Sequence, residues 1–236
     1  MSRKVLFPFL LGAVAVILAA CGGLVSENYA PEIDPANFTT LVDNPYFPLT
    51  PGTTYIYEGE TAEGTERVEV VVTHDTQVVM GVTCIEVRDT VYLNGEVIED
   101  TFDWYAQDNQ GNVWYFGEDT KEYENGQVVS TAGTWKGGVD GAQPGIIMLA
   151  QPEVGHLYRQ EYYAGEAEDM AEVISISESA TVAYGSYDNL VMTREWTPLT
   201  LGLAENKYYA QGIGLVLEVM VEGGSERIEL IDIQTE

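Results

Sequence analysis

Residues 85–126 read IEVRDTVYLNGEVIEDTFDWYAQDNQGNVWYFGEDTKEYENG, and this stretch decides the fold. β-Branched and aromatic residues dominate its runs, and each run ends in turn residues, which is typical of consecutive strands. Asn94-Gly95 and Asn125-Gly126 stand between such runs. This dipeptide favours the positive φ angles of the tight type I′ turn that joins antiparallel strands. The stretch therefore predicts a meander of β-hairpins.

Similar runs extend in both directions, with almost nothing at helical spacing. They predict about twelve strands, at residues 53–60, 66–74, 81–95, 96–110, 111–118, 121–135, 156–165, 170–182, 186–196, 205–212, 214–224 and 225–234. A loop is expected from residue 137 to 155. Hairpins without crossover helices imply an antiparallel sheet, and so many twisted strands curl into a barrel, a half-barrel or two packed sheets. The predicted fold class is mainly β, with these three closures left open.

One predicted strand alternates between apolar and polar residues. Its apolar side carries Ile98, Phe102, Trp104 and Ala106, and its polar side carries Glu99, Thr101, Asp103 and Gln107. Successive side chains point to opposite sides of a sheet. We therefore expect the apolar side to be dry and the polar side to face water.

The amino terminus has the pattern of a bacterial export signal. Arg3 and Lys4 precede sixteen uncharged residues, VLFPFLLGAVAVILAA, a run that is short for a membrane span. Leu18 to Cys21 matches the lipobox of bacterial lipoproteins. We expect a signal peptide at residues 1–20, cleaved before Cys21, and transfer of diacylglycerol and fatty acyl chains such as palmitate to Cys21. Two or three acyl chains would hold the protein permanently at a membrane.

Residues 21–44 lack periodicity and mix polar with small residues, so we expect a lipid-anchored flexible linker there. A single antiparallel β domain is expected at residues 45–236. The expected location is the bacterial cell envelope, on the side facing outside the cytoplasm. Gly22 after the cysteine favours the outer membrane if the organism has two membranes.

The chain is strongly acidic, with 38 Asp and Glu residues against 10 Lys and Arg residues and a formal net charge of −28. Such a surface repels phosphate backbones, which excludes nucleic acid as a partner. It suits cations and cationic protein partners. With Cys21 acylated, Cys84 is the only thiol left, so we expect no intrachain disulfide and a packed, unreactive thiol at Cys84.

Four segments resemble a widespread group of secreted or lipid-anchored bacterial proteins that are mostly uncharacterised. They are DWYAQDNQGNVWYFGEDTKEYENG (103–126), GVDGAQPGIIM (138–148), YRQEYYAGEAED (158–169) and KYYAQGIGLV (207–216). The resemblance spans roughly residues 45–220 and implies a shared fold and an exported location; it transfers no activity and no site. In architecture alone, such a domain is also similar to the half-barrel carriers that move lipoproteins or lipids across the periplasm.

An apolar run, Ile146, Ile147, Met148 and Leu149, lies between two prolines of the predicted loop. Four consecutive large apolar residues do not fit the one-sided burial of a strand. We expect them either to plug the open end of the curled sheet or to line an apolar pocket there. Candidate ligand-binding residues are these four together with Trp104 and Trp114.

A second candidate site is acidic. Glu166, Glu168 and Asp169 lie close together in the sequence, and Asp140 of the preceding loop would add a fourth carboxylate. Calcium prefers six to eight oxygen ligands, so calcium is the cofactor that these residues would hold. The alternative is a solvated acidic turn that binds nothing.

Catalytic motifs are missing from the sequence. His74 and His156 are the only histidines, and neither a G-x-S-x-G nor an H-E-x-x-H motif occurs. We therefore expect a membrane-tethered, non-enzymatic binding module for an apolar or lipid-like small molecule. The alternatives are a calcium-stabilised acidic envelope or surface-assembly protein and, third, a hydrolase with carboxylate chemistry.

Overall fold

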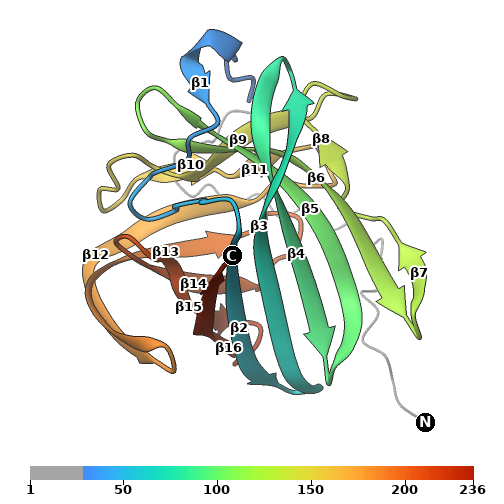
Figure 1. Ribbon diagram of the computed structural model, residues 1–236, viewed down its shortest axis with the longest axis vertical. Helices are drawn as coiled ribbons and strands as arrows, with labels where there is room; N and C mark the ends of the chain where they lie inside the picture. Colours follow the sequence, from blue (N-terminus) through green and yellow to red (C-terminus); the bar gives the residue numbers. More distant parts are fainter. Residues whose placement is uncertain (1–28) are drawn as a thin grey trace, which may run out of the picture.

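The computed structural model describes residues 29–236, and nearly all regular structure in them is β (Figure 1). The strands are β1 (Phe38–Thr39), β2 (Thr53–Thr61), β3 (Gly64–Val79), β4 (Val82–Leu93), β5 (Glu96–Asp108), β6 (Val113–Glu124), β7 (Gln127–Ser130), β8 (Trp135–Lys136), β9 (Gln143–Met148), β10 (Leu157–Arg159), β11 (Glu161–Tyr162), β12 (Met170–Val182), β13 (Gly185–Trp196), β14 (Ala204–Ala210), β15 (Gly214–Glu222) and β16 (Arg227–Thr235). A short 3-10 turn, η1 (Pro35–Asn37), precedes β1. Among residues 29–236, no helix has the length and apolar character that a membrane span requires.

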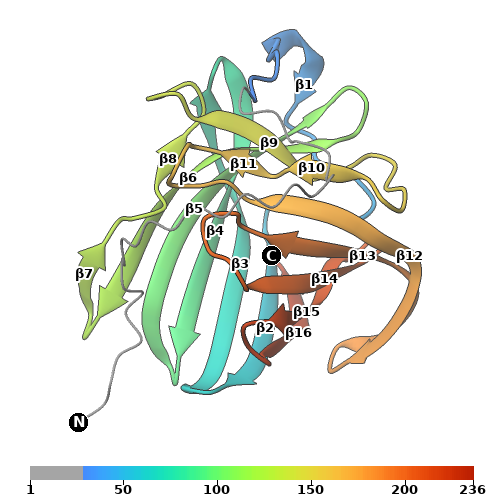
Figure 2. The same cartoon turned by 180° about the vertical axis from the view of Figure 1, so that it is seen from behind.

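The strands form one antiparallel sheet that nearly closes into a barrel. Its main path runs β10-β12-β13-β14-β15-β16-β2-β3-β4-β5-β6-β9-β11. The strands at the two ends of this path, β10 and β11, are separated along the chain only by Gln160. Figure 2 shows β3 to β6 side by side as a curved wall, with β12 to β14 on the opposite side of the molecule. The antiparallel meander predicted from the hairpin signals is confirmed, and its closure is nearly complete.

The two Asn-Gly turns have the predicted conformation. Asn94 and Gly95, between β4 and β5, have φ angles of 52° and 86°, and Asn125 and Gly126, between β6 and β7, have φ angles of 52° and 72°. Positive φ at both central residues defines the type I′ turn. These turns set the pairing of the strands that they connect.

The loop predicted from residue 137 to 155 contains a strand instead, β9. Ile146 pairs with Trp114 of β6, and Gly145 pairs with Tyr115. The other side of β9 pairs with β11. Gly145 permits this crowding, because a Cβ atom at position 145 would collide with the backbone of Arg159 and Gln160. The prediction of a loop was wrong because backbone pairing on both sides of β9 outweighs the missing apolar-polar alternation.

Residues 29–44, predicted to be part of a flexible linker, instead pack against the sheet. Phe38 pairs with Asp108 of β5, and its ring contacts those of Trp114 and Phe116 at centroid distances of 6.0 and 5.3 Å. Val42 is only 2% exposed. Aromatic and aliphatic burial therefore orders this part of the linker. The predicted signal peptide at residues 1–20 and Cys21 lie outside the described residues.

The polar side of β5 faces the interior of the curled sheet, which corrects the prediction that it faces water. Thr101 and Asp103 are 3% and 8% exposed. The apolar side is buried as well: Trp104 and Ala106 pack with Cys84 in an outer cluster. The sheet is therefore covered on both faces here, because its curvature encloses one face and residues 33–38 cover the other.

We expect Gly126→Val to lower the free energy of unfolding by about 1 kcal/mol or more, because a β-branched residue resists the left-handed backbone of this turn. Nothing lies within 4 Å of a Cβ atom at position 126, so the effect isolates backbone strain. Urea denaturation of the variant measures it. Gln127→Val, at the neighbouring exposed position in β7, is the control and should leave stability nearly unchanged. Equal stability of both variants would contradict this account of the turn.

Candidate functional site

Two neighbouring cavities lie inside the curled sheet. The first, which we call the acidic cavity, has a volume of about 380 Å³ and is lined by Tyr115, Glu118, Ile147, Gln160, Glu161, Asp169, Glu195, Trp196, Thr197, Leu203, Ala204, Glu205, Lys207 and Met220. The second, the apolar cavity, has a volume of about 190 Å³ and is lined by Phe47, Pro48, Leu49, Tyr55, Tyr57, Val70, Val87, Asp89, Asp103, Tyr105, Ile147, Lys207, Tyr209, Ile213, Gly214 and Leu215. Ile147 and Lys207 line both, so they mark the junction between the cavities.

Lys207 balances the carboxylates on one side of the acidic cavity. Its ammonium lies 2.9 Å from Glu205, 3.4 Å from Glu195 and 3.6 Å from Glu218. Strand register produces this cluster: Lys207 of β14 is the Cα partner of Glu218 in β15, and Glu205 of β14 is the partner of Glu195 in β13. Burial opposes the charge on Lys207, but the surrounding carboxylates raise its pKa well above the usual value. Lys207 is therefore a permanent cation inside the sheet.

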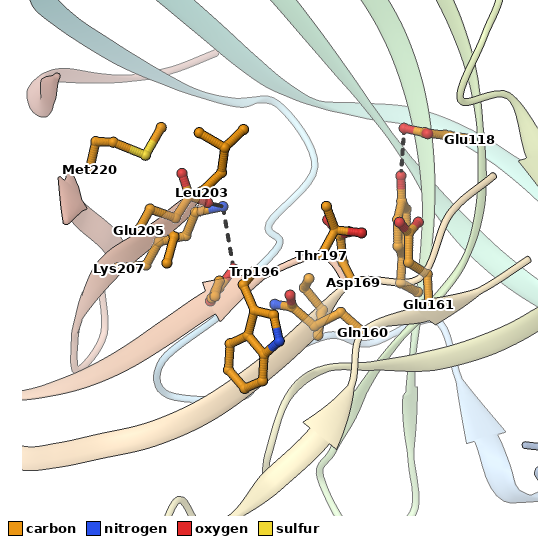
Figure 3. A pocket seen from close by; sticks show the side chains of 14 residues that line it. Glu118, Gln160, Glu161, Asp169, Trp196, Thr197, Leu203, Glu205, Lys207 and Met220 are labelled. Atoms are coloured by element: carbon orange, nitrogen blue, oxygen red, sulfur yellow. Dashed lines mark hydrogen bonds and ion pairs between the residues drawn. The ribbon is translucent and has the colours of Figure 1, made fainter. Parts of the chain in front are cut away.

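The opposite side of the acidic cavity carries carboxyls without such a partner. Figure 3 shows Glu205 and Lys207 on one side and Glu118 and Glu161 on the other. Burial, followed by the charges of nearby acids, raises the pKa of Glu118 to about 9 and that of Glu161 to about 8. Within residues 29–236, no Lys or Arg side chain forms an ion pair with either carboxyl. At neutral pH this side is held largely neutral by protons.

Tyr115 links two of the buried carboxyls. Its hydroxyl lies 2.6 Å from Asp103 and 2.9 Å from Glu118. A phenol has one proton to donate, so both contacts are hydrogen bonds only if one carboxyl is protonated and donates to the phenol oxygen. Burial raises the pKa of Asp103 to about 7, which fits a shared proton. Stacking on Tyr105, with ring centroids 4.9 Å apart, holds Tyr115 in this position.

Gln160 presents an unpaired polar group to the acidic cavity. The residue is 4% exposed, and its backbone N–H donates to the carbonyl of Asp169 at 2.8 Å. Its side-chain Nε2 is buried and has no hydrogen-bond partner. A buried amide without a partner is unfavourable, so a ligand oxygen placed beside Nε2 would stabilise it.

The predicted apolar ligand residues occupy different places. Ile147 lines both cavities. Met148 is buried in the core, and Leu149 packs against the same core cluster. Ile146 is half-buried in β9. Of this run, Ile147 alone lines the cavities, whereas Met148 and Leu149 belong to the core.

Trp104 and Trp114, also predicted to face a ligand, line neither of these cavities, although Trp104 lines a separate pocket of about 360 Å³ together with Lys136. Strand alternation turns Tyr105 and Tyr115 inward and sends the two tryptophans to the outer cluster. The indole N–H of Trp104 donates to Glu86 at 3.2 Å, and that of Trp114 donates to Asp108 at 2.9 Å. Their ring nitrogens are therefore already satisfied by the protein.

The four carboxylates proposed for calcium do not come together. Glu166 and Asp140 are exposed. Glu168 instead accepts from the backbone N–H of Gly165 at 2.9 Å, and Asp169 lines the acidic cavity. Residues 29–236 contain no group of three or more His, Cys, Asp or Glu side chains arranged to hold a metal ion. Calcium binding by these residues therefore stays a prediction without support from this geometry.

Of the carboxyls that line the acidic cavity, the sequence singled out only Asp169 as a candidate site residue, and it did not single out Lys207. Alternation places Asp103 and Thr101 on one side of a strand, but it does not say that this side is enclosed. One signal was present: Lys207 is one of only 10 basic residues in the chain and stands in a strand-like run that begins with Glu205. That signal does not separate an interior cation from a surface one, since Arg67 and Arg88 also stand in strands beside acids and are partly exposed.

No family model matches the chain, and no curated protein matches it significantly. Solved structures with some similarity include a protein of Bacteroides fragilis described as exported and as having a YmcC-like fold, with a TM-score of 0.49, 14% identity, and coverage of 80% of this chain and 99% of that chain. A Parabacteroides distasonis protein described as a lipoprotein has a TM-score of 0.44, 13% identity, and coverage of 80% and 98%. At these values neither similarity bears on the function of this chain.

We expect the protein to be most stable near pH 5 and to lose stability toward pH 9. The folded-state pKa values of the buried carboxyls exceed those of an unfolded chain: about 7 for Asp103, about 8 for Glu161 and Glu218, and about 9 for Glu118. The stability that their bound protons contribute is complete below the unfolded pKa, about 4, and is lost as the pH rises through the folded values. Burial opposes the charge of Glu205, but Lys207 holds its pKa below normal. The stability that this ion pair contributes is therefore present above the unfolded pKa and is lost as the pH falls through the folded pKa.

Denaturant unfolding at about pH 5, 7 and 9 tests this expectation. Glu118→Gln removes one ionisable group and should reduce the decline, whereas Glu96→Gln, at an exposed position, should not. Stability that rises steadily from pH 5 to 9 would show that these carboxyls are not protonated in the fold.

Proposed function

We propose that this chain is a membrane-tethered bacterial lipoprotein of the cell envelope that acts as a non-enzymatic binding module for an apolar or lipid-like small molecule. The export signal and lipobox that end at Cys21 support the location. The apolar cavity beside Ile147 supports the binding role and is the observation that carries this proposal.

The apolar cavity has the character of a small-molecule site. Its walls are mostly aliphatic and aromatic, with Asp89, Asp103 and Lys207 as its charged groups. Ligand sites commonly combine apolar walls with a few polar groups that fix orientation. An apolar cavity of about 150 Å³ is large enough for a benzene-sized molecule. At about 190 Å³, the apolar cavity would accept one ring or a short alkyl chain, and displacement of Ile147 would join it to the acidic cavity.

The anchor would keep these cavities close to the lipid. Tyr29 contacts the closing region of the sheet: its hydroxyl donates to the carbonyl of Pro144 at 3.1 Å, and its ring meets that of Tyr162 at a centroid distance of 5.9 Å. The chain from Cys21 to Tyr29 spans at most about 28 Å when fully extended. A lipid-derived ligand would therefore be available within a short distance of the site.

A binding role also agrees with the positions of the histidines. His74 and His156 are exposed and lie 3.5 Å from Glu236 and Glu153, and neither lines a cavity described above. The side chain most often used for proton transfer at neutral pH is thus remote from the interior.

Cys21→Ser should yield an unacylated, uncleaved precursor, because the thiol is the acceptor for the lipid. Mass spectrometry and partitioning into detergent measure the two effects. Cys84→Ala, which removes the buried thiol of β4, is the control and should leave processing unchanged. Normal cleavage and membrane retention of Cys21→Ser would overturn the lipoprotein assignment.

Ile147→Trp should weaken binding of the neutral fluorescent probe N-phenyl-1-naphthylamine by about tenfold or more. This three-ring probe is too large for the apolar cavity alone and needs the junction at Ile147 to open into the acidic cavity, which the larger ring of Trp would block. The full chain in lipid nanodiscs is titrated, and the signal of empty nanodiscs is subtracted. Ile176→Trp adds the same ring at a position that is 48% exposed and should bind the probe like wild type. Absence of specific uptake by the wild-type chain would remove the apolar-ligand proposal.

A further inference from the structure

We propose that the acidic cavity is a subsite for a small organic cation that also carries a hydrogen-bond-accepting oxygen, recognised by Glu118, Glu161 and Gln160. This inference describes the polar end of the ligand, and in joining that end to an apolar portion it rests on the proposed function. Its test uses ligands that have no long apolar part, so the two proposals can fail separately.

The distribution of charge in the acidic cavity points to a missing cation. On one side, Lys207 lies within 4 Å of Glu195, Glu205 and Glu218. On the other side, Glu118 and Glu161 have no ion-pair partner among residues 29–236. A ligand cation between these two carboxyls would take the role that Lys207 has across the cavity, and would favour their ionised forms over the protonated ones.

Gln160 adds a second requirement for the ligand, beyond the positive charge that the two carboxyls favour. Its amide is buried, lines the cavity and has an unpaired Nε2, which is a donor. Figure 3 shows this side chain among those that project into the cavity, near Asp169 and Thr197. An ammonium group has only donors and cannot satisfy another donor. The ligand therefore needs an oxygen, a hydroxyl or a carbonyl, beside its positive charge.

The remaining walls fit an organic cation better than a metal ion. Trp196, Leu203 and Met220 give the cavity an aromatic and aliphatic side, and all three are only partly buried, so a path to the surface exists. Aromatic faces attract alkylated ammonium groups. No metal-binding arrangement of carboxylates is found in the described part of the chain. The volume of about 380 Å³ is within the range of small-molecule sites.

Choline and two analogues test both requirements by calorimetric titration of the full chain in nanodiscs. Choline has the cation and the hydroxyl, 3,3-dimethylbutan-1-ol replaces the charged nitrogen with carbon, and propyltrimethylammonium replaces the hydroxyl with a methyl group. At about 150 mM salt, where the Debye length is about 8 Å, general attraction to the acidic surface is largely screened. We expect choline to bind about tenfold or more tightly than either analogue.

Single substitutions test which residue is responsible for the preference for the charged nitrogen and which for the preference for the hydroxyl. Glu118→Gln and Glu161→Gln should each weaken choline by about tenfold and leave 3,3-dimethylbutan-1-ol unaffected, while Glu96→Gln, which removes an exposed acid, should bind choline like wild type. Gln160→Met should abolish the preference for choline over propyltrimethylammonium. Gln at positions 118 and 161 keeps size and hydrogen bonding, so these variants should fold, as their melting curves would verify.

Equal binding of choline and its neutral analogue, or equal effects of Glu96→Gln and Glu118→Gln, would overturn the cation subsite. If that happens while the naphthylamine probe still binds in an Ile147-dependent way, only this inference falls. If choline binds as expected and the apolar probe does not, the cation subsite stands and the apolar ligand is the part that fails.

Discussion

The ammonium of Lys207 and the carboxylates of Glu195, Glu205 and Glu218 form the interaction on which the interior of the sheet depends. Alternation along β13, β14 and β15 sends these side chains inward, and the curvature of the sheet then encloses them. Ionised carboxylates confined together repel one another unless a cation lies between them. Because the four residues come from three neighbouring strands, their pairing also favours one register of those strands.

The carboxyls on the other side of the acidic cavity are neutralised in a different way. Glu118, Glu161 and Asp103 have no cation beside them, and burial raises their pKa values so that protons neutralise them in part. A protonated carboxyl both donates and accepts, which suits the two contacts that Tyr115 makes. Beside Lys207, burial still raises the pKa of Glu218 to about 8, so carboxyls on both sides hold protons. The two sides differ in that one contains a fixed cation and the other has no cationic partner among residues 29–236.

The amino-terminal segment connects this interior to the membrane anchor that we propose. Phe38 covers the outer cluster that backs β5 and β6, the strands that present Asp103, Tyr115 and Glu118 to the interior. Tyr29 ends the described segment against Tyr162, next to Glu161 in β11. Packing of residues 29–44 thus brings the point where the tether begins to the wall of the acidic cavity.

Local chemistry in the sequence was enough to predict the antiparallel meander. The type I′ turns at Asn94-Gly95 and Asn125-Gly126 depend only on the φ preferences of adjacent residues, and the runs between turns depend on β propensity, which a sequence displays directly. The location in the envelope was likewise predicted from a local signal, the segment that ends at Cys21, and it remains a prediction. Ile147 was placed in a candidate ligand site because its neighbours are apolar.

Only the tertiary structure decided which face of each strand is enclosed. Asp103 and Thr101 alternate with Trp104 in the same way whether the polar side meets water or a cavity, so alternation alone cannot tell these cases apart. The strand β9 and the ordered segment 29–44 depend on partners far away in the chain, including β6, β11 and the outer cluster. The juxtaposition of Glu118, Gln160, Glu161 and Lys207 arises only because the curled sheet brings β6, β11 and β14 around one space, and no short-range pattern encodes a distance between such strands.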